Sequence, residues 1–365
     1  MSADSRNDVN MTSNASTQIS DFTTENFHLK KTRPRKWLLL GILLPGVILA
    51  GLFATKQYNL YRFHLEKQMR FMMDTYVTVY AIGPKTKTQP AIDAALERMQ
   101  AVDAKFSMHN PDSPVYAFNN QNVPITDREI LNLIALALQI AKDTDGAFDI
   151  TVAPLLELWG FYSRSFRLPG PDEIQQCLKL VGYSNLILSD TELQKKKADV
   201  KIDLGGIAKG YAIGQAAQVF KDHGVSSALI VAGGDIYALG KKADQLWKVG
   251  LRNPRGDGVL GYLEVEDLAV MGSGDYERFF IHEGKRYHHI FDPKTGYPSE
   301  GLTGSFMVGP DPTVANAWNT AIFVMGPEKG LNLVERIPGM EVVMVTTSGQ
   351  IIYSSGLAHA LKPME

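Results

Sequence analysis

Four short polar clusters carry the residues of this 365-residue chain that have the right types for chemistry. They span residues 145–149, 203–209, 272–275 and 288–296, and each places glycine or proline beside charged or hydrogen-bonding side chains. Loops held by rigid elements are where binding groups commonly lie. We therefore expect the reactive groups of the chain in these four clusters.

The second cluster belongs to the stretch 201–212, in which a short apolar run precedes Gly205-Gly206 and a helical apolar pattern follows. This order predicts a strand, a tight turn and a helix. Two glycines let backbone approach a ligand closely, and a helix N-terminus attracts phosphate, with Lys209 in the first turn. The spacing differs from that of a P-loop. Taken alone, the stretch is also explained by an ordinary junction with a surface lysine.

The other clusters offer weaker signals. His289 is by itself better explained as a core histidine, and Asp292 before a proline as a turn former. Ser273 lies between single glycines, which is not the spacing of a nucleophile elbow, so a hydrolase triad is disfavoured. Asn316 and Thr320 are four residues apart on an expected helix and share a face. Two side-chain oxygens there suit Mg²⁺, although a simple polar stripe has the same spacing.

Several elements must position these groups. Apolar residues at helical spacing predict helices over 91–106, 127–142 (with Asp127 as N-cap) and 313–325. Alternation of β-branched and aromatic residues predicts strands, and Ser348-Gly349 predicts the turn of a hairpin. The interleaved order favours a mixed α+β domain over a doubly wound parallel sheet. The expected strands are 71–80, 227–231, 247–251, 261–265 and 289–291, with the hairpin over 344–353.

Charge and cysteine content exclude some classes of protein. A net charge of -2 and a pI near 6.5 exclude a broad nucleic-acid-binding surface, which needs a concentrated positive field. The single cysteine, Cys177, cannot form an internal disulfide, and no cysteine stands directly after the apolar N-terminal run. A lipid-anchored lipoprotein is therefore excluded, and the stability of the domain must come from its core.

The N-terminal region predicts a membrane anchor. Residues 1–36 are polar and aperiodic, which indicates a disordered cytoplasmic tail. Residues 37–54 form an uncharged apolar run long enough to cross a bilayer, and the basic residues before it place the N-terminus in the cytoplasm. We expect a linker over 55–70 and the functional domain over 71–360. The protein would be single-pass in the inner (cytoplasmic) membrane, with its catalytic domain on the periplasmic or extracellular side.

Together, the clusters resemble the FAD:protein FMN transferase family, the ApbE-like flavin transferases. The similarity runs from about Met73 to Met344 and rests on motifs in the family's order. These motifs are Met73-Asp-Thr75, Phe106-Ser107, Asp145-Gly-Ala-Phe-Asp149, Trp159-Gly-Phe161, Asp203-Leu-Gly-Gly-Ile-Ala-Lys-Gly-Tyr211, Ala232-Gly-Gly-Asp235, Ser273-Gly274 with Tyr276, His289-Ile-Phe-Asp-Pro-Lys-Thr-Gly296, and the helix with Asn316 and Thr320 before Gly326.

The resemblance implies a T-fold-like α+β domain that takes FAD and Mg²⁺ and moves FMN onto a Thr or Ser hydroxyl of an acceptor flavoprotein, releasing AMP. It implies that His289 and Lys209 act in catalysis, with His289 assisting proton transfer. Metal ligands would be the Gly206 carbonyl, Asn316 and Thr320. The implied FAD-contacting residues are Met73, His109, Ala147, Phe148, Asp149, Asp203, Lys209, Gly233, Gly234, Asp235, Ser273, His289 and Asp292.

The chain departs from the family pattern at a few positions. Asn316 stands where an aspartate ligand is usual, Gly214 where aspartate is common, Val231 where a polar residue is common, and Gly272 where threonine is usual. The His109 position often carries an aromatic residue. Losing a formal charge beside Mg²⁺ weakens its binding. Two alternatives therefore stay open: a non-catalytic FAD-binding relative, and an FAD pyrophosphatase giving FMN and AMP.

Overall fold

The computed structural model describes residues 47–54 and 64–363, and the chain divides into two units, 1–55 and 56–365. Residues 47–54 are helical, with exposed apolar side chains. The expected tail (1–36) and the first ten residues of the expected anchor lie outside the described residues. Within the two described ranges, no helix combines the length and the apolar character needed to span a bilayer.

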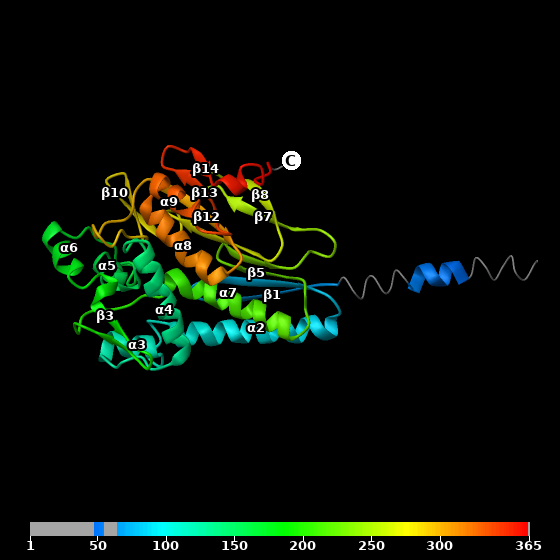
Figure 1. Cartoon of the computed structure of the whole chain (residues 1–365), viewed down its shortest axis with the longest axis horizontal. Coiled ribbons are helices and arrows are strands. Elements are labelled where there is room, and N and C mark those ends of the chain that lie inside the picture. The colour runs from blue at the N-terminus through cyan, green and yellow to red at the C-terminus, as the bar shows by residue number, and fades with distance from the viewer. Residues whose placement is uncertain (1–46, 55–63, 364–365) are drawn as a thin grey trace, which may run out of the picture. The chain divides into compact units, whose positions relative to one another are not determined.

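An eight-stranded sheet forms the centre of the second unit (Figure 1). All seven neighbouring strand pairs are antiparallel, which confirms the expected mixed α+β class over a parallel sheet. The strands in spatial order are β1 (Leu65–Met72), β2 (Thr75–Ile82), β5 (Ala228–Ala232), β6 (Asp235–Leu239), β9 (Leu268–Gly274), β12 (Leu302–Gly309), β13 (Glu341–Thr346) and β14 (Ile351–Tyr353).

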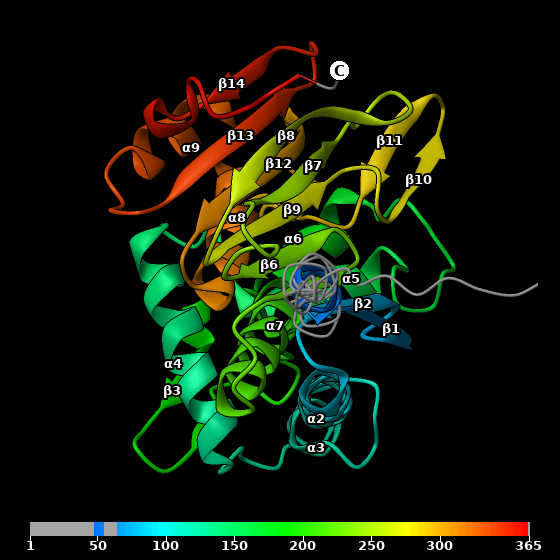
Figure 2. The same cartoon turned by 90° about the vertical axis from the view of Figure 1, so that its right-hand side faces the viewer.

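Helices cover one face of this sheet and a hairpin covers part of the other (Figure 2). Along the strand order, α2 (Lys85–Phe106) contacts β1 and β2, and α7 (Gly205–Asp222) contacts β5 and β6. Next, α8 (Pro312–Met325) contacts β9 and β12, and α9 (Pro327–Val334) contacts β13. The hairpin of β7 (Trp247–Arg252) and β8 (Val259–Val265) packs its apolar side chains on β6, β9, β12 and β13.

The remaining elements surround the end of the sheet near β3, α5 and β10 in Figure 1. Local side chains define where several of them begin: Ser113 accepts a hydrogen bond from the Tyr116 N–H, and Asp127 from the N–H groups of Glu129 and Ile130, which confirms Asp127 as an N-cap. These elements are α3 (Pro114–Gln121), α4 (Arg128–Asp143), η1 (Ile150–Val152), α5 (Ala153–Leu158), α6 (Pro171–Leu178), η2 (Tyr183–Asn185), β3 (Leu186–Leu188), β4 (Leu193–Lys195), β10 (Phe279–His282) and β11 (Lys285–His288). One more short helix, η3 (Ser355–Leu357), lies elsewhere and contacts β13.

The prediction of one strand over 71–80 is wrong. The chain turns at Met73 and Asp74, which have φ of 54° and 57°, and β1 and β2 pair on either side of them. The Asp103 carboxylate accepts a hydrogen bond from the Met73 N–H (2.9 Å) and so holds this turn. As a result, the sheet already begins at Leu65, inside the stretch that was expected to be a linker.

Two further expected strands are absent from the described fold. Residues 201–204 are irregular because the Asn119 side chain, instead of a neighbouring strand, pairs with both the N–H and the carbonyl of Ile202, each at 2.8 Å. Residues 289–291 follow the end of β11, and only Phe291 forms an isolated bridge, to Pro298. The chain is thereby free to turn at both places, where the polar clusters lie.

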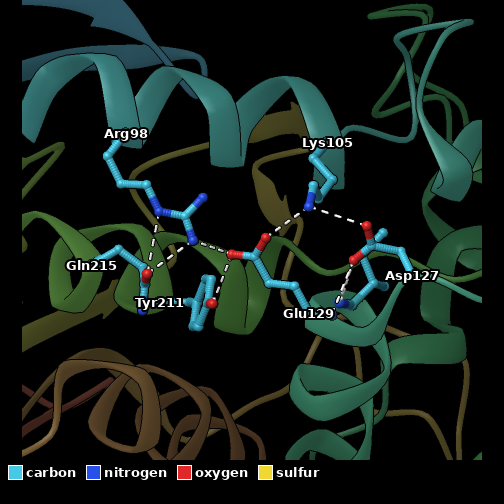
Figure 3. A network of polar contacts seen from close by, with 7 residues as sticks. Arg98, Lys105, Asp127, Glu129, Tyr211 and Gln215 are labelled. Carbon is cyan, nitrogen blue, oxygen red and sulfur yellow. Dashed lines mark hydrogen bonds and ion pairs between the residues drawn. The ribbon is translucent and has the colours of Figure 1, made fainter. Parts of the chain in front are cut away.

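A network of charged side chains ties α2, α4 and α7 together (Figure 3). The Glu129 carboxylate accepts hydrogen bonds from Lys105 (2.8 Å), from the Tyr211 hydroxyl (2.8 Å) and from Arg98, which also contacts Gln215. These partners lower the pKa of Glu129 to about 2 against the opposing effect of its burial. The network fixes α7, and with it the glycine-containing start of that helix.

We expect Glu129→Gln to lower the free energy of unfolding at neutral pH by up to about 3 kcal/mol, because the pKa shift measures how strongly the fold favours the charged carboxylate. This contribution is complete above the unfolded pKa of about 4.5 and is lost as the pH falls toward 2. Urea unfolding at pH 7 and pH 3 measures both effects. Glu173→Gln, which removes an exposed partner of Arg167, is the control and should cost much less. If both variants lose the same free energy of unfolding, the Glu129 network does not stabilise the fold in the way proposed.

Candidate active site

A cavity of ≈ 370 Å³ lies where the polar clusters meet. The glycine stretch with Lys209, the segment after His289, and the side chains of Asn316 and Thr320 all line it, as do residues 147–149 and 272–274. Four clusters that are far apart in the sequence therefore converge on one site. Of the residues expected to contact FAD, the cavity lining includes Met73, His109, Ala147, Phe148, Asp149, Asp203, Lys209, Gly233, Ser273 and His289, and it leaves out Gly234, Asp235 and Asp292.

The two glycines expected in a turn are instead the first residues of α7. Asp203 precedes them and accepts a hydrogen bond from the Gly205 N–H (2.7 Å), while its other oxygen accepts one from the Tyr162 hydroxyl (2.7 Å). A Cβ on Gly206 would lie 3.0 Å from the Phe148 ring and 3.5 Å from the Thr320 hydroxyl. The start of α7 thus lies directly against α8, and its residues Gly205 and Gly206 line the cavity.

A third glycine, Gly210, sets the distance between α7 and α8. A Cβ at this position would lie 2.2 Å from the Pro312 carbonyl oxygen and 2.7 Å from Cβ of Asn316. The Gly210 N–H also donates a hydrogen bond to Asn316 Oδ1 (3.2 Å). The two helices therefore touch backbone to backbone at the point where Asn316 is presented.

Lys209 forms an ion pair with Asp235 (2.9 Å). The Asp235 side chain is only 1% exposed, and its other carboxylate oxygen accepts a hydrogen bond from the Gly272 N–H (2.8 Å). Asp235 therefore faces Lys209 and β9, and it lies behind the cavity lining. This arrangement holds the ammonium group in place and leaves about a third of the lysine side chain exposed to the cavity.

The three residues expected to bind a metal lie together and offer only neutral oxygens. Asn316 is buried, and the Thr320 hydroxyl donates to the Asn316 carbonyl (3.3 Å) one turn earlier. Asn316 Oδ1 already accepts from Gly210 but retains a second lone pair. No group of three or more His, Cys, Asp or Glu in residues 47–54 and 64–363 is placed to hold a metal. A hard cation fits here when phosphate oxygens supply the negative charge.

His289 lies in the cavity wall directly after β11. Its Nδ1 is 3.2 Å from the Arg278 carbonyl oxygen, which also accepts the His289 backbone N–H (3.1 Å). Since a carbonyl only accepts, Nδ1 carries the proton and Nε2 keeps a free lone pair. Desolvation, followed by the nearby Arg278 guanidinium, lowers the pKa of His289 well below its usual value. The neighbouring His288 is buried and bonded to the Ser299 carbonyl, as expected of a structural histidine.

Several expected contact residues have their side chains engaged by the protein itself. Both carboxylate oxygens of Asp149 accept hydrogen bonds, from Thr151 (2.8 and 2.6 Å) and from the Tyr183 N–H (2.6 Å), so this buried carboxylate shapes the cavity wall. Asp292 accepts from the Lys294 N–H (2.9 Å) and begins a turn, in line with its alternative interpretation. Ser273 accepts from Asn319 (2.9 Å).

Four polar residues of the cavity wall are absent from the sequence motifs: Tyr162, Arg278, Asp103 and Glu277. The Tyr162 ring meets the His109 ring edge-on at 5.2 Å, and its hydrogen bond to Asp203 links two clusters. Arg278 is exposed at the cavity and adds a cation beside His289. The Trp159-Gly-Phe161 motif directly before Tyr162 was a usable signal for it. No local pattern pointed to Arg278.

Comparison with known proteins identifies close relatives of the whole second unit. A family model described as the ApbE family matches residues 73–344. A curated protein of Treponema pallidum named FAD:protein FMN transferase is 32% identical over 311 residues, which cover 79% of this chain and 86% of the relative. A protein of the same name from Escherichia coli K12 is 30% identical over 266 residues, covering 69% of this chain and 75% of the relative.

Solved structures agree with these matches. The ApbE protein of Thermotoga maritima superposes with a TM-score of 0.77 at 37% identity, covering 82% of this chain and 100% of that chain. The flavinyl transferase ApbE of Pseudomonas stutzeri, in its apo form, superposes with a TM-score of 0.74 at 30% identity, covering 84% and 99%. The likeness in sequence and in fold therefore extends over nearly all of each matched structure.

Proposed function

This chain belongs to the ApbE family, and from that membership we propose that it is an FAD:protein FMN transferase. One observation carries the proposal from family to chemistry: Lys209, His289 and the Asn316–Thr320 pair line the same cavity. Phosphoryl transfer needs positioned charge more than covalent help from the enzyme, and these groups supply it. The T-fold-like assignment of the domain is part of the same proposal.

In this proposal the FAD diphosphate lies at the start of α7. The positive dipole end of that helix and the Lys209 ammonium offer positive potential to the phosphate oxygens. Because Asp235 pairs with Lys209 from behind the cavity, the lysine side chain is held in one direction. The two rings of His109 and Tyr162 form part of the cavity wall and give the flavin or adenine an aromatic surface.

His289 acts as the general base in the transfer step. The Thr or Ser hydroxyl oxygen of the acceptor attacks the FMN phosphorus, and its proton passes to His289 Nε2. The bond from that phosphorus to the bridging oxygen breaks, and AMP leaves with the bridging oxygen and the bonding electrons. A new phosphoester joins FMN to the acceptor. The lowered pKa keeps His289 neutral, and therefore able to accept the proton, at neutral pH.

Mg²⁺ would be held by the Gly206 carbonyl, Asn316 and Thr320. When bound, it polarises phosphoryl oxygens and orients the leaving group. The residues fit it because all three offer hard oxygen atoms at the crossing of α7 and α8. They contribute no formal charge, so the diphosphate must supply the negative charge around the ion.

We expect Asn316→Asp to tighten Mg²⁺ binding by about tenfold, because a carboxylate restores a charged ligand. Calorimetric titration with Mg²⁺ in the presence of FAD measures this independently of turnover. Asn319→Asp is the matched control. Asn319 lies on the same helix, but its side-chain amide is buried and bonds Ser305 and the Met271 carbonyl of β9. The substitution should therefore lower the stability of the fold without raising the affinity for Mg²⁺. Unchanged Mg²⁺ affinity in Asn316→Asp would remove residue 316 from the ligand set.

The proposal also covers the cellular location of the protein and the nature of its acceptor. The basic residues before the apolar run 37–54 support a single-pass protein of the inner membrane whose domain faces the periplasm or the exterior. The acceptor would then be an extracytoplasmic flavoprotein with a reactive Thr or Ser. Membrane orientation is tested by adding protease to intact spheroplasts. If the domain faces outward, the protease should digest residues 64–363 in all of the protein.

The transferase assignment is tested by incubating the full chain with FAD, Mg²⁺ and a panel of extracytoplasmic flavoprotein domains. FMN should remain on an acceptor after denaturation, seen as in-gel flavin fluorescence, with one AMP released for each label. AMP release without any labelled acceptor would show a pyrophosphatase instead. Bound FAD with neither AMP nor label would show a non-catalytic relative.

A further inference from the structure

Among residues 64–363, no element covers the β1–β2 end of the sheet face on which β7 and β8 pack. Four large apolar side chains lie open there: Leu65 (45% exposed), Met69 (56%) and Phe71 (66%) on β1, and Tyr76 (62%) on β2. We call these four residues the β1–β2 face. The β7–β8 hairpin packs mainly on β6, β9, β12 and β13 and reaches this end only at partly buried residues.

The strand register explains why these side chains are on one face. Phe71 pairs with Tyr76, and Leu65 pairs with Ile82, so alternate residues of β1 and β2 point to the same side. The intervening residues of β2, Val77 and Val79, are fully buried toward the helices. The exposed apolar residues are thus a consequence of the register, which also places Lys67, over the Tyr80 ring, on the same face. Large apolar side chains gathered on one exposed face are typical of an interaction site.

The β1–β2 face begins at the rim of the cavity. Phe71 and Tyr76 stand close to the Met73–Asp74 turn, with their rings edge-on at 5.4 Å, and Met73, Asp74 and Thr75 line the cavity itself. The turn is held rigidly, because Asp103 binds the Met73 N–H and Thr75 packs against Gly233. In addition, β1 is an edge strand, with β2 as its only neighbour in the sheet that the structure describes.

We propose that the β1–β2 face is the docking surface for the protein acceptor. This inference rests on the proposed function: the reaction requires a folded protein to bring a hydroxyl into the cavity, so the surface of that protein must cover the rim. A partner with a complementary apolar surface would bury Phe71 and Tyr76, and its backbone can pair with the free edge of β1. The opposite edge strand, β14, also exposes Ile351 (39%) and Tyr353 (44%), but it contributes no residue to the cavity lining.

The test uses the full chain and a flavoprotein domain that the wild-type protein labels with FMN. We expect Met69→Glu and Phe71→Glu each to raise the KM for this acceptor about tenfold or more, because each carboxylate must be desolvated on docking. The FAD dissociation constant and the kcat of transfer at saturating acceptor should stay at wild-type values, since neither side chain lines the cavity. Ile351→Glu is the matched control and should leave the KM unchanged.

Each outcome of this test has one meaning. If the wild-type chain labels no acceptor, the proposed function fails before the surface is tested. If labelling occurs and both variants keep the wild-type KM, the docking surface is wrong. The docking surface is equally wrong if the substitutions abolish a dimer in sedimentation, or binding to vesicles of anionic lipid, without changing the KM. Thermal melting of each variant shows whether it is folded. If Phe71→Glu is unfolded, the KM of Met69→Glu alone decides the test.

Discussion

Replacing His289 with alanine is expected to lower the rate of FMN transfer by about 10²- to 10⁴-fold, the usual contribution of a general base. The dissociation constant of FAD should change little, because His289 contributes one side of a wall built from many residues. Stopped-flow measurement of AMP release, with FAD binding followed by flavin fluorescence, separates the two quantities.

The neighbouring histidine provides the control for this experiment. His288→Gln removes a buried ring that bonds the Ser299 carbonyl and packs edge-on against Phe323. It should lower stability and leave most of the transfer rate intact. Equal loss of FAD binding and of rate in His289→Ala would mean that His289 is structural as well.

The lowered pKa of His289 also predicts the pH profile. A base works only when deprotonated, so kcat/KM should stay flat from pH 8 through 6.5 and fall only well below 6.5. A histidine with its usual pKa would already lose half of its activity near 6.5. A fall centred at 6.5 would show that Arg278 and desolvation do not set the titration of the free enzyme.

Replacing Gly210 with alanine is expected to damage both fold and activity. The new methyl group would lie 2.2 Å from the Pro312 carbonyl oxygen, so α7 and α8 must separate. Such overpacking against backbone costs about 3 kcal/mol or more. A displacement near 1 Å of Asn316 relative to Gly206 should reduce transfer about 100-fold. Urea unfolding and single-turnover labelling measure the two losses.

Gly214, one turn later on the same helix, is the matched control. A Cβ there would lie 3.3 Å from Cγ of Pro312, a ring edge that can shift slightly, and alanine is the better helix former. Gly214→Ala should therefore be close to neutral. If Gly210→Ala were equally harmless, the helix contact would not determine the geometry of the site.

The helices and caps of this fold are predictable from the sequence, because their signals are local. Asp127 begins α4 as expected, and the spacing of Asn316 and Thr320 places both on the cavity side of α8. The convergence of the polar clusters followed from the family resemblance. It did not follow from any one motif.

Several strands lie outside the predicted ones, and for β12 and most of β1 the physical reason is clear. β12 is fully buried, yet it contains threonine, serine and two glycines, so it lacks the apolar run of a core strand. Its polarity is tolerated because Asn319, from α8, bonds Ser305 within the core. β1 alternates apolar residues with polar ones, and the polar ones, Glu66, Gln68 and Arg70, lie on the less exposed side, where residues of α2 pair with them. In both cases the partner that explains the strand is distant in the sequence.

The order of strands in the sheet has a consequence for biogenesis. β2 ends at Ile82, and its next neighbour, β5, begins at Ala228, so residues 83–227 must leave the ribosome before the two can pair. Until then α2 can cover one side of the β1–β2 hairpin, but the edge of β2 that pairs with β5 stays open, and the apolar side chains on the other side stay exposed. We expect nascent chains that end before residue 228 to be bound by chaperones. Full-length chains should be released from the chaperones once β5 has paired with β2.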